Sequence, residues 1–347
     1  MINYKTFLYK FLKLTNFKKI SSNINAKEYS FIIDLTSSNI NFDLSLFLII
    51  FSIKSKNKKT NIIVLPNKKF SNLRIKEKNE LLQNINIRLQ NILIPLINNI
   101  ENFKPNIFIM HEWNEIYKFQ NHKLFPNIDK EKQEFVIKTN VYSYKLLSKY
   151  HSKFNLNVNK IKGQESYLKI VNNFFKNNNI NLNKVITITL RNSSYQTERN
   201  SNEKDFVRFA DFLDKNGYIP IILDDYEKII SSQSNIPIKY KLYNECVHDL
   251  NLRIALYESS LLNIFTNGGP VTIANLSKNI NFMFFKIATE GKNYPTNIKF
   301  IEEFLGLKKN EKFNFLNKKQ IFIWEEDNYE NLIKNFEKHI GNFEESA

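Results

Sequence analysis

Short apolar runs alternate with longer amphipathic stretches along this chain, and this alternation constrains its fold more than any other feature. Between residues 29 and 111 the apolar runs have the length of strands, and the stretches between them have helical periodicity. The same alternation restarts near residue 184 and continues to residue 324. Strands that alternate with helices are typical of βαβ units and parallel sheets. The sequence therefore predicts the α/β class, as two open domains in tandem.

The elements can be placed from their periodicity. Predicted strands cover residues 29–35, 61–65, 106–111, 184–190, 218–223, 261–265, 281–286 and 320–324. Predicted helices cover residues 42–54, 75–100 with a break near Pro95, 141–154, 166–176, 203–216 ended by Gly217, 250–259, a short one from 271, and 327–340. The polar segment 155–164 reads as a linker. We expect one domain over 1–160, a second over 161–325 and a C-terminal helix in 326–347.

The cysteine content and the missing motifs exclude several kinds of chemistry. Cys246 is the one cysteine of the 347 residues, so the chain has no disulfide framework and no cysteine-based zinc site. The metal and hydrolase motifs HExxH, CxxC, DxD and GxSxG do not occur. The sequence predicts no metal site, no cofactor and a reducing, cytoplasmic setting.

The net charge of +16 is weak evidence for a polyanionic partner such as nucleic acid. It comes from 50 Lys and Arg residues against 34 Asp and Glu residues, spread along the whole chain rather than clustered. We therefore expect no nucleic-acid partner. Residues 1–20 have apolar side chains near helical spacing among lysines, which fits either a helix packed on the first domain or peripheral contact with an anionic membrane. The most apolar run, 44–53, is too short to span a membrane, which takes about 20 residues, and it reads as a buried helix.

Two adjacent glycines mark the turn Asn267-Gly268-Gly269-Pro270, directly after an apolar strand and before a helix start. Glycine permits close approach of a ligand and a positive φ. Pro270 suits a first helical turn, whose free N–H groups can bind an anion. The turn is therefore a candidate phosphate cradle, and the alternative is an ordinary tight turn.

The loop RNSSYQTERNSN, at 191–202, places two arginines after another predicted strand. The chain has only six arginines, and a guanidinium can bind phosphate oxygens in a bidentate way that lysine cannot copy. Arg191 and Arg199 are thus candidates to bind a diphosphate. The alternative is a capping loop for the helix that follows.

Carboxylates at strand and helix ends are candidates for the remaining roles. Asp224 and Asp225 follow the strand at 218–223, and Glu258 ends a predicted helix, so these three could bind ribose hydroxyls. In the first domain, Asp34 and His111 each follow a strand and compete for the role of general base.

The segment 267–274, Asn-Gly-Gly-Pro-Val-Thr-Ile-Ala, resembles the Asp-Thr-Gly-Pro-x-His-Leu-Ala turn of bacterial heptosyltransferases. The resemblance covers residues 185–340, and two segments in it, VITITLRNSSYQTERNSN and LRIALYESSLLNIFTNGGP, are still more similar to bacterial proteins of unassigned function from surface-polysaccharide clusters. It implies the GT-B architecture, with two Rossmann-like domains facing a cleft and a tail helix that crosses back to the first domain. In that family the turn binds the phosphates of a sugar nucleotide. Asn267 and Thr272 replace the family's Asp and His, and its glycine-rich loop with the base is not evident.

The resemblance implies a metal-independent glycosyltransferase with a nucleotide-sugar donor and a glycan or glycolipid acceptor. Arg191, Arg199 and the 267–270 turn would then hold the donor diphosphate. The alternatives are a sugar-nucleotide epimerase on the same fold and a non-catalytic protein that binds nucleotide sugars or nucleic acid.

Overall fold

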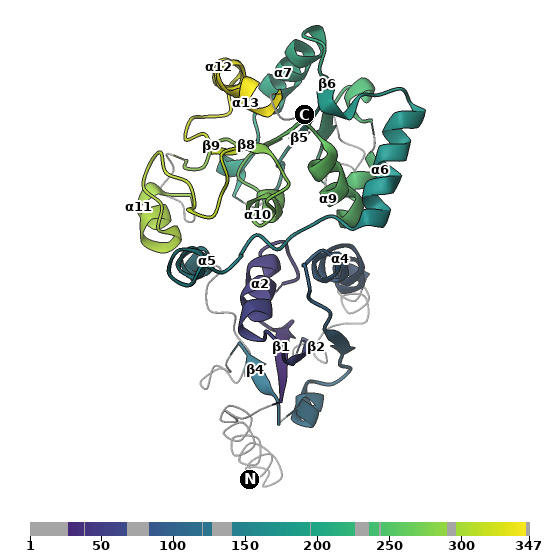
Figure 1. The fold of residues 1–347 in the computed structure, drawn as a ribbon, viewed down its shortest axis with the longest axis vertical. Helices are drawn as coiled ribbons and strands as arrows, with labels where there is room; N and C mark the ends of the chain where they lie inside the picture. The colour runs from purple at the N-terminus through teal and green to yellow at the C-terminus, as the bar shows by residue number, and fades with distance from the viewer. Residues whose placement is uncertain are drawn as a thin grey trace, which may run out of the picture. The chain divides into compact units, whose positions relative to one another are not determined.

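Two separate sheets of parallel strands organise the chain, so the predicted α/β class is confirmed (Figure 1). The computed structural model describes residues 27–37, 39–67, 83–119, 121–126, 141–194, 196–225, 236–242, 244–289 and 296–344. The chain divides into a first unit, Met1–Leu93 with Asn102–Asn140, and a second unit, Ile94–Glu101 with Val141–Ala347. Each unit contains one of the sheets.

The sheet of the first unit has the order β3-β2-β1-β4, all parallel. Its strands are β1 (Glu28–Asp34), β2 (Lys59–Leu65), β3 (Asn106–Ile109) and β4 (Lys123–Phe125). Helix α2 (Leu44–Lys54) is apolar on nearly every side, and it buries Leu44 through Phe51. The ring of Phe51 lies 5.6 Å from that of Phe31 on β1, so α2 covers one face of the sheet. The 3-10 helix η3 (Trp113–Phe119) packs on Ile32 and Ile63 of the other face.

The sheet of the second unit has the order β6-β5-β7-β8-β9, also all parallel. Its strands are β5 (Val185–Thr189), β6 (Ile219–Leu223), β7 (Leu262–Phe265), β8 (Phe282–Phe284) and β9 (Gln320–Phe322). After β5 the chain adds β6 on one side, and it then continues with β7 on the other side. The strand order therefore reverses between β5 and β7, and ligands of open α/β sheets bind at such a point, outside the carboxyl ends of the strands.

Helices cover both faces of this second sheet (Figure 1). Helix α7 (Glu203–Lys215) buries Phe206, Phe209, Ala210 and Leu213, an i, i+3, i+4, i+7 stripe typical of a helix on a core. Helices α12 (Tyr329–His339) and α13 (Gly341–Glu344) complete the same core. Helices α6 (Glu165–Asn177) and α9 (Leu250–Ser259) pack against one another beside the sheet, and α9 is anchored by the ring of Tyr257, which lies 5.1 Å from that of Phe265 on β7.

The division of the chain differs from the expected boundary at residue 160. Helix α5 (Val141–Phe154) and the segment 155–164 belong to the second unit. The segment expected to be a linker is packed, because Val158 and Ile161 are buried and the Ile161 N–H donates to the Leu276 carbonyl at 2.9 Å. The short stretch Ile94–Glu101 also belongs to this unit. There the side-chain nitrogen of Asn99 donates to the side-chain oxygen of Asn251 at 2.8 Å.

The C-terminal tail also lies in the second unit. Leu332 and Phe336 of α12 are part of the core that α7 shares with the sheet. The described tail is therefore a structural part of the second unit, where the sequence resemblance implied a helix that crosses back to the first.

Apart from the helix predicted over 75–100, the predicted elements that the structure describes lie within three residues of observed ones, whereas short observed elements such as β4, η3 and α13 have no predicted counterpart. Strand β4 was not predicted, because three residues are too few to show a periodicity. The predicted helix 75–100 is described only from residue 83, and its break near Pro95 takes the form of a π-helical turn, Leu89–Leu93, that leads into α4 (Ile94–Asn98). The predicted N-terminal helix of residues 1–20 lies outside the described residues. None of the described helices has the length and apolar character that a membrane crossing needs.

A polar cluster lies near the amino ends of the strands of the first unit. His122 Nδ1 is 2.8 Å from the buried Ser30 hydroxyl, and Nε2 is 3.5 Å from a carboxylate oxygen of Glu28. Burial lowers the pKa of His122, and the nearby Lys59 lowers it further, while the Glu28 carboxylate acts in the opposite direction. The fold therefore favours the neutral imidazole.

This cluster predicts a pH dependence of stability. The folded state binds fewer protons at His122 than the unfolded state, so the stabilisation is complete above the unfolded pKa of about 6.5 and is lost as the pH falls through the lower folded pKa. His122→Gln is expected to reduce the change in the free energy of unfolding between about pH 7.5 and about pH 5.5, measured by urea unfolding. His339, whose pKa burial also lowers, is present in both proteins and cancels in the comparison. An equal pH dependence in the two proteins would contradict the prediction.

Candidate functional site

The loop after β5 meets the turn after β7 at the reversal point of the second sheet. The Ser201 and Thr266 hydroxyls are 2.7 Å apart, and the Arg199 guanidinium donates to the Asn267 side-chain oxygen at 2.9 Å. Gly268 lies beside Arg191, since a Cβ added to it would be 3.8 Å from both the Cβ and the Cδ of Arg191. The structure thus brings together the two predicted phosphate-binding segments, 191–202 and 267–270.

Arg191 is held at both its backbone and its side chain. Its N–H donates to the Ser201 hydroxyl at 2.8 Å, and its carbonyl accepts from the Ser201 N–H at 2.9 Å. Its guanidinium donates to the Asn200 side-chain oxygen and to the Gln196 carbonyl, the latter at 3.3 Å. The loop therefore fixes the direction of this guanidinium through amide oxygens of its own residues. The neighbouring Tyr195 lies outside the described residues.

Asn267 uses both ends of its side-chain amide. Its oxygen accepts from Arg199, and its nitrogen donates to the Ile287 carbonyl at 3.0 Å. An aspartate here, as in the heptosyltransferase turn, could accept from Arg199 but could not donate to Ile287. The amide is therefore the side chain that suits these two partners.

If Arg199 binds a diphosphate, as the sequence predicts, Asn267→Asp is expected to weaken that binding. The new carboxylate would pair with Arg199 and compete with a ligand for its charge, and it would face the Ile287 carbonyl without a proton to donate. We expect a loss of about tenfold in affinity for a nucleoside diphosphate, measured by isothermal titration calorimetry. Asn267→Gln, which keeps both amide groups, is the control for the charge. An affinity that rises with aspartate would contradict this role for Arg199.

The glycine turn starts helix α10 (Gly269–Asn275), and Pro270 lies in its first turn as predicted. Gly268 has φ −142°, an extended conformation open to any residue. The positive φ expected for this turn is therefore not what places glycine here. Among the described glycines, Gly217 and Gly306 have a positive φ, and Gly217 does so at +79°, at the predicted end of α7.

The three carboxylates proposed for a nucleoside lie in different surroundings. Asp225 follows β6 and accepts from the Asn192 N–H at 3.1 Å, which brings it to the loop of residues 191–202 that carries Arg191 and Arg199, called the arginine loop below. Asp224 is buried; one carboxylate oxygen accepts from the Asp225 N–H at 2.8 Å, and the other has no hydrogen-bond partner among the described residues. Glu258 lies apart from this group, at the end of α9, where it accepts from the Ser277 hydroxyl at 3.1 Å. Burial raises the pKa of Glu258.

The two candidate bases of the first unit both follow strands of its sheet. Asp34 ends β1 and is completely buried; its carboxylate accepts from the Trp113 indole N–H at 3.1 Å and from the Thr36 N–H at 3.0 Å. His111 follows β3 and is exposed, and its backbone N–H donates to the Glu115 carboxylate. Hydrogen bonds from Lys118 and from the backbone lower the pKa of Glu115 to about 2.

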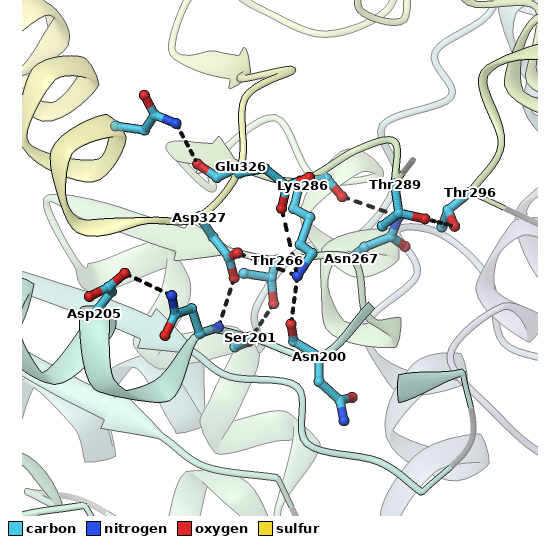
Figure 2. A network of polar contacts seen from close by, with 12 residues as sticks. Asn200, Ser201, Asp205, Thr266, Asn267, Lys286, Thr289, Thr296, Glu326 and Asp327 are labelled. Carbon is cyan, nitrogen blue, oxygen red and sulfur yellow. Dashed lines mark hydrogen bonds and ion pairs between the residues drawn. The ribbon is translucent and has the colours of Figure 1, made fainter. Parts of the chain in front are cut away.

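Sequence reasoning missed two charged residues of this site, Lys286 and Asp327. Figure 2 shows the Lys286 ammonium between the arginine loop and Asp327. Lys286 was hidden because the predicted strand 281–286 included it, whereas β8 ends at Phe284 and leaves it in the post-strand loop. Asp327 is distant in sequence, and only the fold brings it here. Within the described ranges, no group of three or more His, Cys, Asp or Glu residues could hold a metal ion.

The chain matches no family model and no curated protein. It is similar to the solved structure of the glycosyl transferase family 9 protein from Veillonella parvula DSM 2008, with 12% identity, 93% of this chain and 99% of that chain covered, and a TM-score of 0.49. It is also similar to the structure of the E. coli ADP-heptose lps heptosyltransferase II, with 10% identity, 92% of this chain and 100% of that chain covered, and a TM-score of 0.41. A third similar structure is that of the UDP-GlcNAc 2-epimerase from Methanocaldococcus jannaschii, with 14% identity, 89% of this chain and 92% of that chain covered, and a TM-score of 0.35. All three TM-scores are below 0.5, so the function must be inferred from the residues of the site.

Proposed function

We propose that this chain is a glycosyltransferase that transfers a sugar from a nucleoside-diphosphate donor to the precursor of a cell-surface glycan or glycolipid, without a metal ion. One observation supports it above the others: Arg191 and Arg199 share one hydrogen-bonded loop at the reversal point of the second sheet. Two guanidinium groups there could neutralise a diphosphate and stabilise the charge that grows on it as the sugar leaves. The resemblance of residues 267–274 to the heptosyltransferase turn agrees with this chemistry.

The carboxylates after β6 suit the nucleoside part of the donor. The oxygen of Asp224 that has no partner among the described residues is an acceptor that a ribose hydroxyl or a base amino group could satisfy. Asp225 is fixed against the arginine loop by the Asn192 N–H. We assign the nucleoside to these two residues and give Glu258 a structural role, since the groups that hydrogen-bond to it, on Gly163, Ser277 and Asn279, lie outside the loops at the reversal point.

The first unit would supply the base that deprotonates the acceptor hydroxyl. Topology favours Asp34, because the strand order β3-β2-β1-β4 reverses next to β1. Exposure favours His111, because Asp34 is covered and both of its oxygens accept hydrogen bonds. Turnover by Asp34→Asn and by His111→Ala, at saturating donor, decides between them: the variant of the true base loses about two to four orders of magnitude in kcat.

Thermal unfolding in the presence of nucleoside diphosphates tests the proposal. At a concentration one hundred times Kd, a bound nucleoside diphosphate stabilises the protein by about 2.7 kcal/mol. We expect the nucleoside diphosphate with one particular nucleobase to raise the unfolding temperature more than the others do. We expect EDTA to leave this stabilisation unchanged. Stabilisation by none of them, together with salt-sensitive binding of RNA or DNA, would overturn the proposal.

Product analysis with the sugar form of the preferred nucleotide then separates the remaining functions. A transferase releases the nucleoside diphosphate and needs an acceptor for full turnover. An epimerase yields an isomeric nucleotide sugar with no acceptor present. A binding protein gives no product in either case.

A further inference from the structure

Lys286 is the charged residue that connects the tail of the second unit to the arginine loop. It follows β8 with φ +53°, in the left-handed region that side chains other than glycine adopt at a cost. Its N–H donates to the Glu325 carbonyl at 3.0 Å, which ties this backbone to the residues after β9. Only 14% of its side chain is exposed. Lys286 thus has a largely covered cationic side chain on an unfavourable backbone conformation, and its contacts must offset the cost of both.

The Lys286 ammonium reaches three oxygens. It donates to the Asn200 carbonyl at 2.9 Å, and it lies 3.5 Å from Asp327 and 3.8 Å from Glu326 (Figure 2). The second carboxylate oxygen of Asp327, which is buried, accepts from the Asn202 N–H at 3.0 Å. Lys286 and Asp327 therefore form an ion pair that binds the carbonyl of Asn200 and the N–H of Asn202, and this pair holds the end of the arginine loop at two backbone groups.

Asn200 carries this constraint to Arg191. The Asn200 side-chain oxygen accepts from the Arg191 guanidinium and from the Ser193 N–H, the latter at 3.1 Å. Its side-chain nitrogen donates to the Ser193 carbonyl at 3.0 Å. The backbone of Asn200 is thus held by Lys286, while its side chain holds the guanidinium of Arg191.

We propose that Lys286, paired with Asp327, is a positioning residue: it fixes Asn200, and Asn200 aims the Arg191 guanidinium at the donor diphosphate. The part of this proposal that concerns a diphosphate rests on the proposed function. The part that concerns the order of the arginine loop does not depend on it. Lys286 acts through Arg191 and makes no contact with the ligand.

Hydrogen–deuterium exchange tests the ordering of the loop in the unliganded protein. In Lys286→Met, the amides of Arg191 and Ser193 are expected to exchange about tenfold faster, because their acceptors on Ser201 and Asn200 are no longer held in place. Lys286→Arg is expected to restore part of the protection.

Asp327→Asn, which keeps an acceptor for the Asn202 N–H, gives a second variant in case Lys286→Met does not fold. The matched control is Lys334→Met, which removes an ion pair with Glu325 from a side chain that is 60% exposed. Unchanged exchange at 191–202 in Lys286→Met, or in Asp327→Asn in its place, would overturn the proposal.

A double-mutant cycle tests how the residue acts on binding. Lys286→Met is expected to lower the affinity for the nucleoside diphosphate that stabilises the wild type by about tenfold. In the Arg191→Ala background the same change is expected to cost nothing more, because the positioned group is already gone. Losses that add would mean that Lys286 contacts the ligand itself, and would overturn the proposal. If the wild type binds no nucleoside diphosphate, the proposed function fails, and the exchange experiment still decides whether Lys286 orders the loop.

Discussion

Arg191→Ala is expected to remove most of the stabilisation of this protein by nucleoside diphosphates. The side chain of Arg191 lies beside Gly268 at the reversal point of the sheet, and under the proposed function its removal would take away two charge-assisted hydrogen bonds to the diphosphate. We expect a loss of about 3 kcal/mol in binding free energy, or roughly a hundredfold in Kd, measured by isothermal titration calorimetry. The variant should fold, because the backbone bonds between residues 191 and 201 do not need the side chain.

The matched control for this change is Arg208→Ala. Arg208 lies on α7 of the same unit, with 56% of its side chain exposed, an ion pair to Asp205 at 3.1 Å and its guanidinium 4.0 Å from the ring centre of Tyr329. Its removal lowers the net charge by the same amount, and we expect no change in affinity. If both variants lost affinity equally, general electrostatic attraction would explain binding better than a site at Arg191.

The largest effect on stability is expected from Phe336→Ala in the C-terminal helix. Phe336 is 3% exposed, and its ring centre lies 5.7 Å from that of Phe209 on α7 and 5.3 Å from that of Tyr218. A cavity left by a deleted core phenylalanine costs about 3–5 kcal/mol. Urea unfolding can be followed by the fluorescence of Trp324, in a Trp113→Phe background that removes the other of the two tryptophans.

Phe154→Ala provides the comparison, since this phenylalanine of α5 is 57% exposed. We expect it to change the free energy of unfolding by less than about 1 kcal/mol. A loss below about 1 kcal/mol in Phe336→Ala as well would show that the tail is not part of the core of the second unit.

The alternation of the sequence predicted the strands of the second sheet well, because their residues are mostly apolar or β-branched and nearly all buried. β5 and β6 of the second unit, with burial along nearly their whole length, show how strong this signal is. The polar residues after the strands were equally visible in the sequence, since Arg191 follows β5 and Asn267 follows β7. Both features are local in the sequence, and local features can be recognised without the fold.

What the sequence could not show depends on contacts between distant residues. The unit boundary was placed too late because segment 155–164 is polar in composition, yet Val158 and Ile161 are buried against other parts of the second unit. Lys286 and Asp327 look like ordinary charged residues in the sequence. Lys286 is 86 residues away from Asn200, to which it donates a hydrogen bond, and only the fold reveals this contact. Glu258 has the residue type of a ribose ligand, but its place on α9 puts it beside Ser277.

The stretch Ile94–Glu101 has a consequence for the order in which the protein can be completed on the ribosome. It is made early, between two parts of the first unit, yet Asn99 hydrogen-bonds to Asn251, which follows 152 residues later. At about 5–20 residues per second, synthesis of that interval takes roughly 8–30 s. During this time the stretch must wait without its partner, and a fragment that begins at residue 141 would lack it. Coexpression of such a fragment with a peptide of residues 94–101 would show how much of the second unit depends on this early segment.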